Sequence, residues 1–262
     1  MQVVVIGAQG FVGSAFCSYF ASRPGVDVLP ITRNNYERER GRSRDVVIDA
    51  SGNSKKYLAD EDPLRDFDLS VTHRLRTLLD YPARCHVHIS SVDVYPDLTR
   101  PEATSESRLV DRTRQSLYGF HKILAEDLVR KHAASWLIIR LAGMVGPGLR
   151  KNPVYDVLNR KPLRIHPDSR YQFMHTDYVA KICWLLIERG IRQCEINVCG
   201  RGHISPREIA VMAGCPLDLS LLPEEALPRV VDANVGRLSE YAPIPETRDT
   251  IRDFCEMFAQ FS

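Results

Sequence analysis

Short apolar runs alternate along the chain with longer stretches in which apolar residues recur every three or four positions. The run 2–7, QVVVIG, is rich in β-branched residues and ends in glycine, which is typical of a buried parallel strand. Similar runs lie at 26–32, 45–51, 85–90, 135–142 and 194–200. Helical spacing is found between them, at 11–23, 67–81, 116–129 and 176–190. This alternation predicts an α/β protein with a parallel sheet.

The second and third of these runs are unusually close in sequence. Only 13 residues, Arg33–Asp45, separate the second run from VVIDAS. A doubly wound sheet ordinarily places a helix, a strand and another helix there, and a single crossover already needs about 10–12 residues. We therefore expect a doubly wound parallel sheet of about six strands that lacks the usual third strand.

A glycine-rich turn joins the first run to the first helical stretch. It reads GAQGFVG, and its spacing is GxxGxxG over Gly7, Gly10, Phe11, Val12 and Gly13. Glycines here allow a tight turn, close approach of the backbone to a pyrophosphate, and close packing of helix on strand. The helix N-terminus then offers N–H groups to the anion. The position after an N-terminal buried strand predicts a Rossmann-type dinucleotide site rather than glycines that serve packing alone.

Two parts of the chain lack the regular alternation. We expect residues 1–143 and 174–200 to form the dinucleotide-binding Rossmann domain. Residues 144–173 and 201–262 would form a small, mainly C-terminal substrate lobe that caps the carboxyl ends of the strands, where ligands bind in such sheets.

The residue after the second run bears on the choice of cofactor. Domains that prefer NAD carry an acid there, whereas this chain has ITRNN, with Arg33. A cation favours the added 2′-phosphate of NADP(H), with NAD(H) as the alternative. Further arginines follow, and they either support that phosphate or form a solvated loop with Glu37, Glu39 and Asp45: they are Arg38, Arg40, Arg42 and Arg44. Only Arg33 is assigned to the cofactor.

The amino-acid composition indicates the broad class of protein but not the reaction that it catalyses. Hydrophobic residues make up 44% and charged residues 26% of the 262 residues, and the net charge is +2. These values are ordinary for a globular enzyme and give no reason to expect a nucleic-acid or membrane partner. The seven cysteines form no CxxC and no zinc-like cluster with histidine, so we expect a reduced, cytoplasmic protein without a metal site.

The stretch SLYGFHK places Tyr118 and Lys122 four residues apart. On a helix this spacing puts both side chains on one face, either as a proton-transfer pair or as an incidental surface pair. The glycine turn, HISSVDVYP over 88–96 and YxxxK together resemble the extended short-chain dehydrogenase/reductase family of sugar epimerases, dehydratases and 4-ketoreductases. The resemblance implies that Tyr118 is the acid/base, that Lys122 lowers its pKa and holds the nicotinamide ribose, and that Ser91 positions the substrate oxygen.

The same resemblance assigns further residues. Asp93 lies where dehydratases carry an acid, so it is either a second catalytic acid or a solvated residue at a strand end. The segment after the third strand and the helix that follows it would touch the cofactor, as would the end of a later strand. These positions are Ala50, Ser51, Gly52, Ser70, Leu141 and Ala142.

Together these features predict an NAD(P)-dependent oxidoreductase. The substrate would be a small molecule, sugar-like and possibly a nucleotide sugar, with hydride transfer at a secondary alcohol or ketone carbon. Gly143 and Tyr171 stand where many nucleotide-sugar members have asparagine and arginine, which leaves the substrate open. An epimerase or dehydratase with tightly bound cofactor is the first alternative, and a non-catalytic dinucleotide sensor or scaffold is the second. The family analogy also suggests a possible homodimer.

Overall fold

A six-stranded parallel sheet forms the centre of the protein. The computed structural model describes residues 1–261. The strands follow the order β2-β1-β3-β4-β5-β8 across the sheet. Their bounds are β1 Gln2–Ile6, β2 Asp27–Ile31, β3 Arg44–Asp49, β4 Ala83–Ser91, β5 Trp136–Leu141 and β8 Cys194–Val198. The doubly wound Rossmann-type fold is therefore confirmed.

The missing third strand is also confirmed. β3 pairs directly with β1, so β2 is left at the edge of the sheet. The connection between β2 and β3 contains only the short helix α2, Tyr36–Glu39. That length of chain cannot provide a further crossover and strand.

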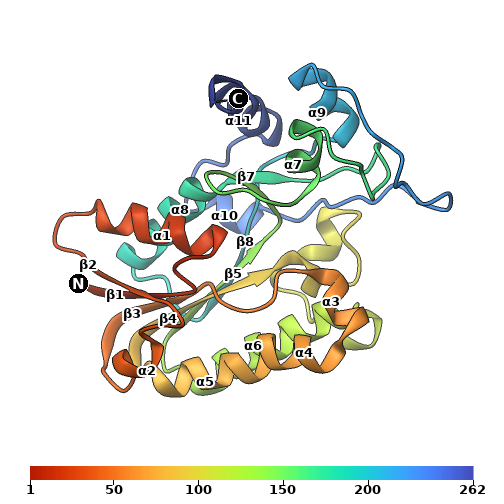
Figure 1. Cartoon of the computed structure of the whole chain (residues 1–262). Coiled ribbons are helices and arrows are strands. Elements are labelled where there is room, and N and C mark those ends of the chain that lie inside the picture. Colours follow the sequence, from red (N-terminus) through yellow and green to blue (C-terminus); the bar gives the residue numbers. More distant parts are fainter. Residues whose placement is uncertain (262) are drawn as a thin grey trace.

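Helices cover both faces of the sheet (Figure 1). On one face α1, Phe11–Ala21, packs beside α8, Thr176–Glu188. On the other face α5, His73–Asp80, packs beside α6, Leu117–His132. The chain reaches α5 through α3, Lys56–Glu61, and α4, Pro63–Phe67.

The single helix predicted over 67–81 is in fact composite. Residues Asp68–Thr72 form a π-helical turn, η1, between α4 and α5. Such turns are often found near functional sites. The apolar spacing of the sequence is compatible with both windings, which is why it could not reveal this one.

A second apolar cluster lies beyond the carboxyl ends of the strands. It gathers residues from 145–173 and 204–258, including Phe173, Ile204 and Ile251. The elements there are β6 Gly143–Val145, β7 Phe173–His175, α7 Pro153–Leu158, α9 Pro206–Ala213 and α11 Thr247–Phe261, with α10 Gly236–Ser239 nearer the sheet. Figure 1 shows α7, α9 and α11 together above the sheet. The division into two domains at the predicted boundaries stays a prediction.

The remaining segments are short. Three 3-10 turns follow β4: η2 Val92–Val94, η3 Pro101–Thr104 and η4 Arg112–Arg114. Among the described helices, none combines the length and the apolar character that crossing a bilayer would require.

A buried ion pair fixes α6 against the sheet. Glu126 of α6 has no exposed surface and pairs with Arg140 of β5 at 2.6 Å. The same carboxylate accepts a hydrogen bond from Ser90 of β4 at 2.7 Å. Burial alone would raise the pKa of Glu126, but Arg140 and Arg130 outweigh it and hold the pKa below its ordinary value. One carboxylate therefore joins the helix to two neighbouring strands.

We predict that Glu126→Gln destabilises the protein by about 3–5 kcal/mol, because it leaves the Arg140 charge buried without its partner. The measurement is urea unfolding at neutral pH. The matched control is Asp168→Asn, which breaks the exposed pair with Arg207 and should cost no more than about 1 kcal/mol. A cost for Glu126→Gln as small as that of the control would contradict the assigned role.

Candidate functional site

The glycine turn lies where β1 meets α1. Gly10 is the N-cap of α1, its N–H donates to the Gly7 carbonyl at 2.8 Å, and no side chain caps the helix. A Cβ atom at Gly13 would lie 2.1 Å from the Gly7 carbonyl oxygen, so only glycine permits this approach of helix to turn. Phe11 and Val12 form the first turn of the helix, which carries no acidic side chain. This cradle fits a pyrophosphate.

Arg33 lies beside this turn. It follows β2, whose Ile31 carbonyl accepts the Ala8 N–H at 3.3 Å. Arg33 is exposed and makes no hydrogen bond or ion pair with the described residues. Its guanidinium is therefore available to a ligand at the carboxyl end of β2.

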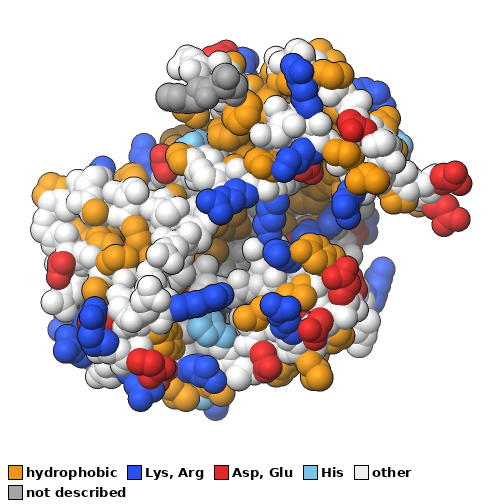
Figure 2. Space-filling model, viewed as in Figure 1, with side chains coloured by type: hydrophobic (Ala, Val, Ile, Leu, Met, Phe, Trp, Pro, Cys, Tyr) orange, Lys and Arg blue, Asp and Glu red, His pale blue; other side chains and the backbone are white. Residues whose placement is uncertain are grey.

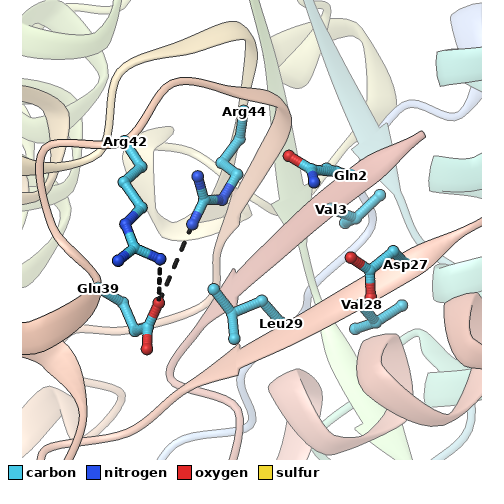
Figure 3. A pocket seen from close by; sticks show the side chains of 8 residues that line it. All are labelled: Gln2, Val3, Asp27, Val28, Leu29, Glu39, Arg42 and Arg44. Carbon is cyan, nitrogen blue, oxygen red and sulfur yellow. Dashed lines mark ion pairs between the residues drawn. The ribbon is translucent and has the colours of Figure 1, made fainter.

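The other arginines of this loop are paired with acids. Arg38 pairs with Glu39 at 3.0 Å and Arg40 with Glu37 at 2.9 Å. Figure 3 shows Arg42 and Arg44 turned toward Glu39, in a pocket that also includes the first residues of β1 and β2. This pocket lies at the amino ends of those strands, opposite the edge where the glycine turn sits. Arg38, Arg40 and Arg42 therefore fit the solvated-loop alternative, whereas Arg44 is largely buried at the start of β3.

The segment after β3 packs against the glycine turn. A Cβ atom at Gly7 would lie 2.9 Å from the Ser51 nitrogen and 3.0 Å from the Ala50 carbonyl. The Ser51 hydroxyl donates a hydrogen bond to the Asp49 carboxylate and lies 2.9 Å from His73 Nε2. The predicted cofactor segment Ala50–Gly52 thus borders the cradle.

Ser91 is the last residue of β4, and its hydroxyl is part of a charged cluster. It donates to Asp93 Oδ2 at 2.9 Å. The other carboxylate oxygen, Oδ1, binds both Lys56 Nζ and Arg229 Nη2 at 2.6 Å. Leu141 lies beside Ser91 in the sheet register, and Ala142 follows it, so these predicted residues share one edge with the serine.

Helix α6 places Tyr118 and Lys122 at the same edge. Ser116 caps the helix by accepting the Gly119 N–H at 3.2 Å, so Tyr118 sits in the first turn. Ser91 lies close enough to Tyr118 to act on its phenol, whose pKa it lowers slightly against the larger effect of burial. Lys122 Nζ lies 5.3 Å from the Tyr118 ring centroid. Ser91, Tyr118 and Lys122 are therefore brought together from a strand and a helix.

The electrostatic setting favours a protonated tyrosine. Burial raises the pKa of Tyr118 above its ordinary value of 10, and the carboxylates of Asp93 and Asp66 raise it further. The expected lowering by Lys122 is therefore not found, because burial and these two acids dominate. Burial lowers the pKa of Lys122 to about 8, and Arg74 adds to this fall. Near neutral pH the pair is thus a phenol beside an ammonium ion.

A hollow opens next to these groups. A pocket of about 450 Å³ is lined by Asp93, Tyr95, Arg114, Ser116 and Arg229, among others. Figure 2 shows a hollow on the face viewed, with Lys and Arg side chains gathered around its rim. Both cationic and acidic side chains therefore border the pocket, Arg114 and Arg229 together with Asp93 and Asp97.

A family model matches most of the chain. The model of the NAD dependent epimerase/dehydratase family matches residues 3–80 and 43–199, two overlapping segments. The chain belongs to this family. It is an enzyme of the short-chain dehydrogenase/reductase type whose cofactor is a nicotinamide dinucleotide, as the motifs predict. No curated protein matches the chain by sequence.

Solved structures of epimerases and reductases share the fold. UDP-glucuronic acid 4-epimerase from Bacillus cereus, in complex with UDP-glucuronic acid and NAD, has a TM-score of 0.81 at 18% identity and covers 100% of both chains. RMD from Pseudomonas aeruginosa, complexed with NADPH, has a TM-score of 0.80 at 19% identity. The match covers 100% of this chain and 99% of that one. dTDP-4-dehydrorhamnose reductase from Bacillus anthracis, in complex with NADP, has a TM-score of 0.75 at 14% identity, and the match covers 98% of each chain.

The structure also brings in residues that the motifs did not indicate. Lys56 and Arg229 reach Asp93 from α3 and from a loop 136 residues away in sequence. The backbone carbonyl of Asn53 accepts a hydrogen bond from Lys122 Nζ at 2.8 Å. The buried carboxylate of Asp66 accepts from the Asn53 side chain. Long-range partners of this kind leave no local pattern in a sequence.

Proposed function

We propose that the protein catalyses NADP(H)-dependent reduction, or the reverse oxidation, at a ketone or secondary alcohol carbon of a sugar-like substrate. The observation that carries this proposal is the convergence of Ser91, Tyr118 and Lys122 beside the segment that follows β3. The relatives in complex with UDP-glucuronic acid, NAD or NADPH support a nucleotide-sugar substrate and a nicotinamide cofactor.

Different residues would bind the cofactor, transfer the proton and position the substrate oxygen. Gly7–Gly13 and the segment Ala50–Gly52 would hold the dinucleotide, which supplies or accepts the hydride when bound. In the reducing direction the Tyr118 phenol gives its proton to the substrate oxygen, and Lys122 stabilises the phenolate that remains. Ser91 would turn its hydroxyl hydrogen from Asp93 to that same oxygen. Burial keeps the Tyr118 phenol protonated, which is the form that this step requires.

The environment of Asp93 favours this reaction over dehydration. A general acid must hold a proton near neutral pH. Burial alone would raise the pKa of Asp93, but Lys56 and Arg229 outweigh it and keep the pKa below its ordinary value. Asp93 is then a carboxylate that orients Ser91. Epimerisation, which needs no such acid, remains the alternative.

We expect Tyr118→Phe to lower turnover by about 100-fold or more, because the proton donor is lost. The assay follows NADPH consumption with a panel of nucleotide keto-sugars. The control is Tyr19→Phe, whose hydroxyl makes no hydrogen bond to the described residues and which should retain full activity. Dinucleotide binding by Tyr118→Phe, followed by fluorescence, should persist. Unchanged turnover in Tyr118→Phe would overturn the proposed function.

Arg33→Ala should weaken NADPH binding by about 10-fold or more and leave NADH binding nearly unchanged, since only NADPH carries the 2′-phosphate. The measurement is fluorescence titration with both nucleotides. Arg38→Ala is the matched control, because Arg38 is also exposed to solvent but paired with Glu39. Equal weakening of both nucleotides, or tighter binding of NADH by the unmodified protein, would refute the assignment of Arg33.

A further inference from the structure

A buried carboxylate lies behind the catalytic pair and belongs to none of the predicted site residues. Asp66, in α4, has no exposed surface. One of its oxygens accepts from Asn53 Nδ2 at 2.7 Å and from the Ser70 hydroxyl at 3.2 Å. The other lies 2.7 Å from His121 Nδ1. Three groups from three segments therefore meet on one carboxylate.

Two of these contacts lead directly to Lys122. Asn53 is fixed by Asp66 and by hydrogen bonds to the backbone of Lys55, and its own carbonyl accepts from Lys122 Nζ at 2.8 Å. His121 precedes Lys122 on α6, so its contact with Asp66 fixes the helix at that turn. Asp66 thus holds both the acceptor of the ammonium group and the helix that carries it.

Charges face Lys122 from every element around it. Arg74 of α5 and Lys151, before α7, disfavour the ammonium form, and Asp66 and Asp93 favour it. His88 of β4 also faces this region, and burial keeps the pKa of His88 well below its ordinary value, so it is neutral. Asp93 is already neutralised by Lys56 and Arg229. Arg74 is itself paired with Asp49 of β3. Asp66 has no Lys or Arg partner among the described residues, and its ion-pair contact there is with His121.

We propose that Asp66 is a positioning residue that holds Lys122 in place and in its charged form beside Tyr118. The proposal rests on the function assigned above to Lys122. The proposal also gives Ser70 a role, because its hydroxyl donates a hydrogen bond to Asp66.

The test removes the charge and keeps the shape. In Asp66→Asn the amide oxygen can accept from Asn53 and Ser70, and the amide N–H₂ can donate to Nδ1 of the other His121 tautomer. Trace acetylation with acetic anhydride over a range of pH, read by mass spectrometry, reports the protonation of Lys122. Lys131, exposed on the same helix, is the internal reference. The assay needs no substrate.

We expect the labelling midpoint of Lys122 to fall by about one pH unit or more in Asp66→Asn, because the charge favouring the ammonium form is gone. Asp66→Glu, which keeps the charge, should restore the midpoint. Asp68→Asn, an exposed acid two residues further along, should leave it unchanged. Asp66→Ser is a second uncharged variant and should match Asp66→Asn.

An unshifted midpoint in folded Asp66→Asn or Asp66→Ser would overturn the inference. Collapse of both uncharged variants, with Asp66→Glu folded, would overturn it too, since Asp66 would then serve the fold rather than Lys122. Neither result touches the proposed function, which stands or falls with turnover in Tyr118→Phe.

Discussion

The active arrangement depends on how closely α6 approaches the end of β4. A Cβ atom at Gly119 would lie 2.2 Å from the Asp93 carbonyl oxygen, so any other residue would push the helix away from the strand. Gly119 directly follows Tyr118, and Asp93 lies two residues after Ser91. The contact between these two backbones therefore decides whether the tyrosine hydroxyl reaches the serine. Further along the helix, Glu126 secures the same approach through Ser90 and Arg140.

The helical layer that carries this contact is unusually rich in buried charge. Two buried pairs join these helices to the sheet: Arg74 of α5 with Asp49 of β3, and Glu126 of α6 with Arg140 of β5. Buried pairs are expensive to desolvate, so they are weak evidence for stability. Their value here is geometric and electrostatic, because Arg74 acts on Lys122 and Asp66 opposes it. The proton chemistry proposed for Tyr118 would therefore depend on charges outside the set of Ser91, Tyr118 and Lys122.

The sequence was informative where the residues concerned lie in short continuous segments. The 13 residues Arg33–Asp45 were enough to predict about six strands without the usual third one. The structure then shows β2 at the edge of the sheet. The order of the glycine turn, SSVDVY and YxxxK indicated the family. Spacing could not reveal the π-helical turn at Asp68–Thr72, since both helical windings suit the same apolar pattern. Nor could it reveal Arg229 or Asp66, whose partners become neighbours only after the chain folds.

The central claim is that the dinucleotide reaches from the glycine turn to Tyr118 and Lys122. A crystal structure of the protein with NADP⁺ tests it most directly. The account predicts the pyrophosphate at the N-terminus of α1, the nicotinamide ribose on Lys122, and the nicotinamide ring beside Tyr118 and the end of β5. A dinucleotide bound elsewhere, or one whose nicotinamide lies away from Tyr118, would contradict it.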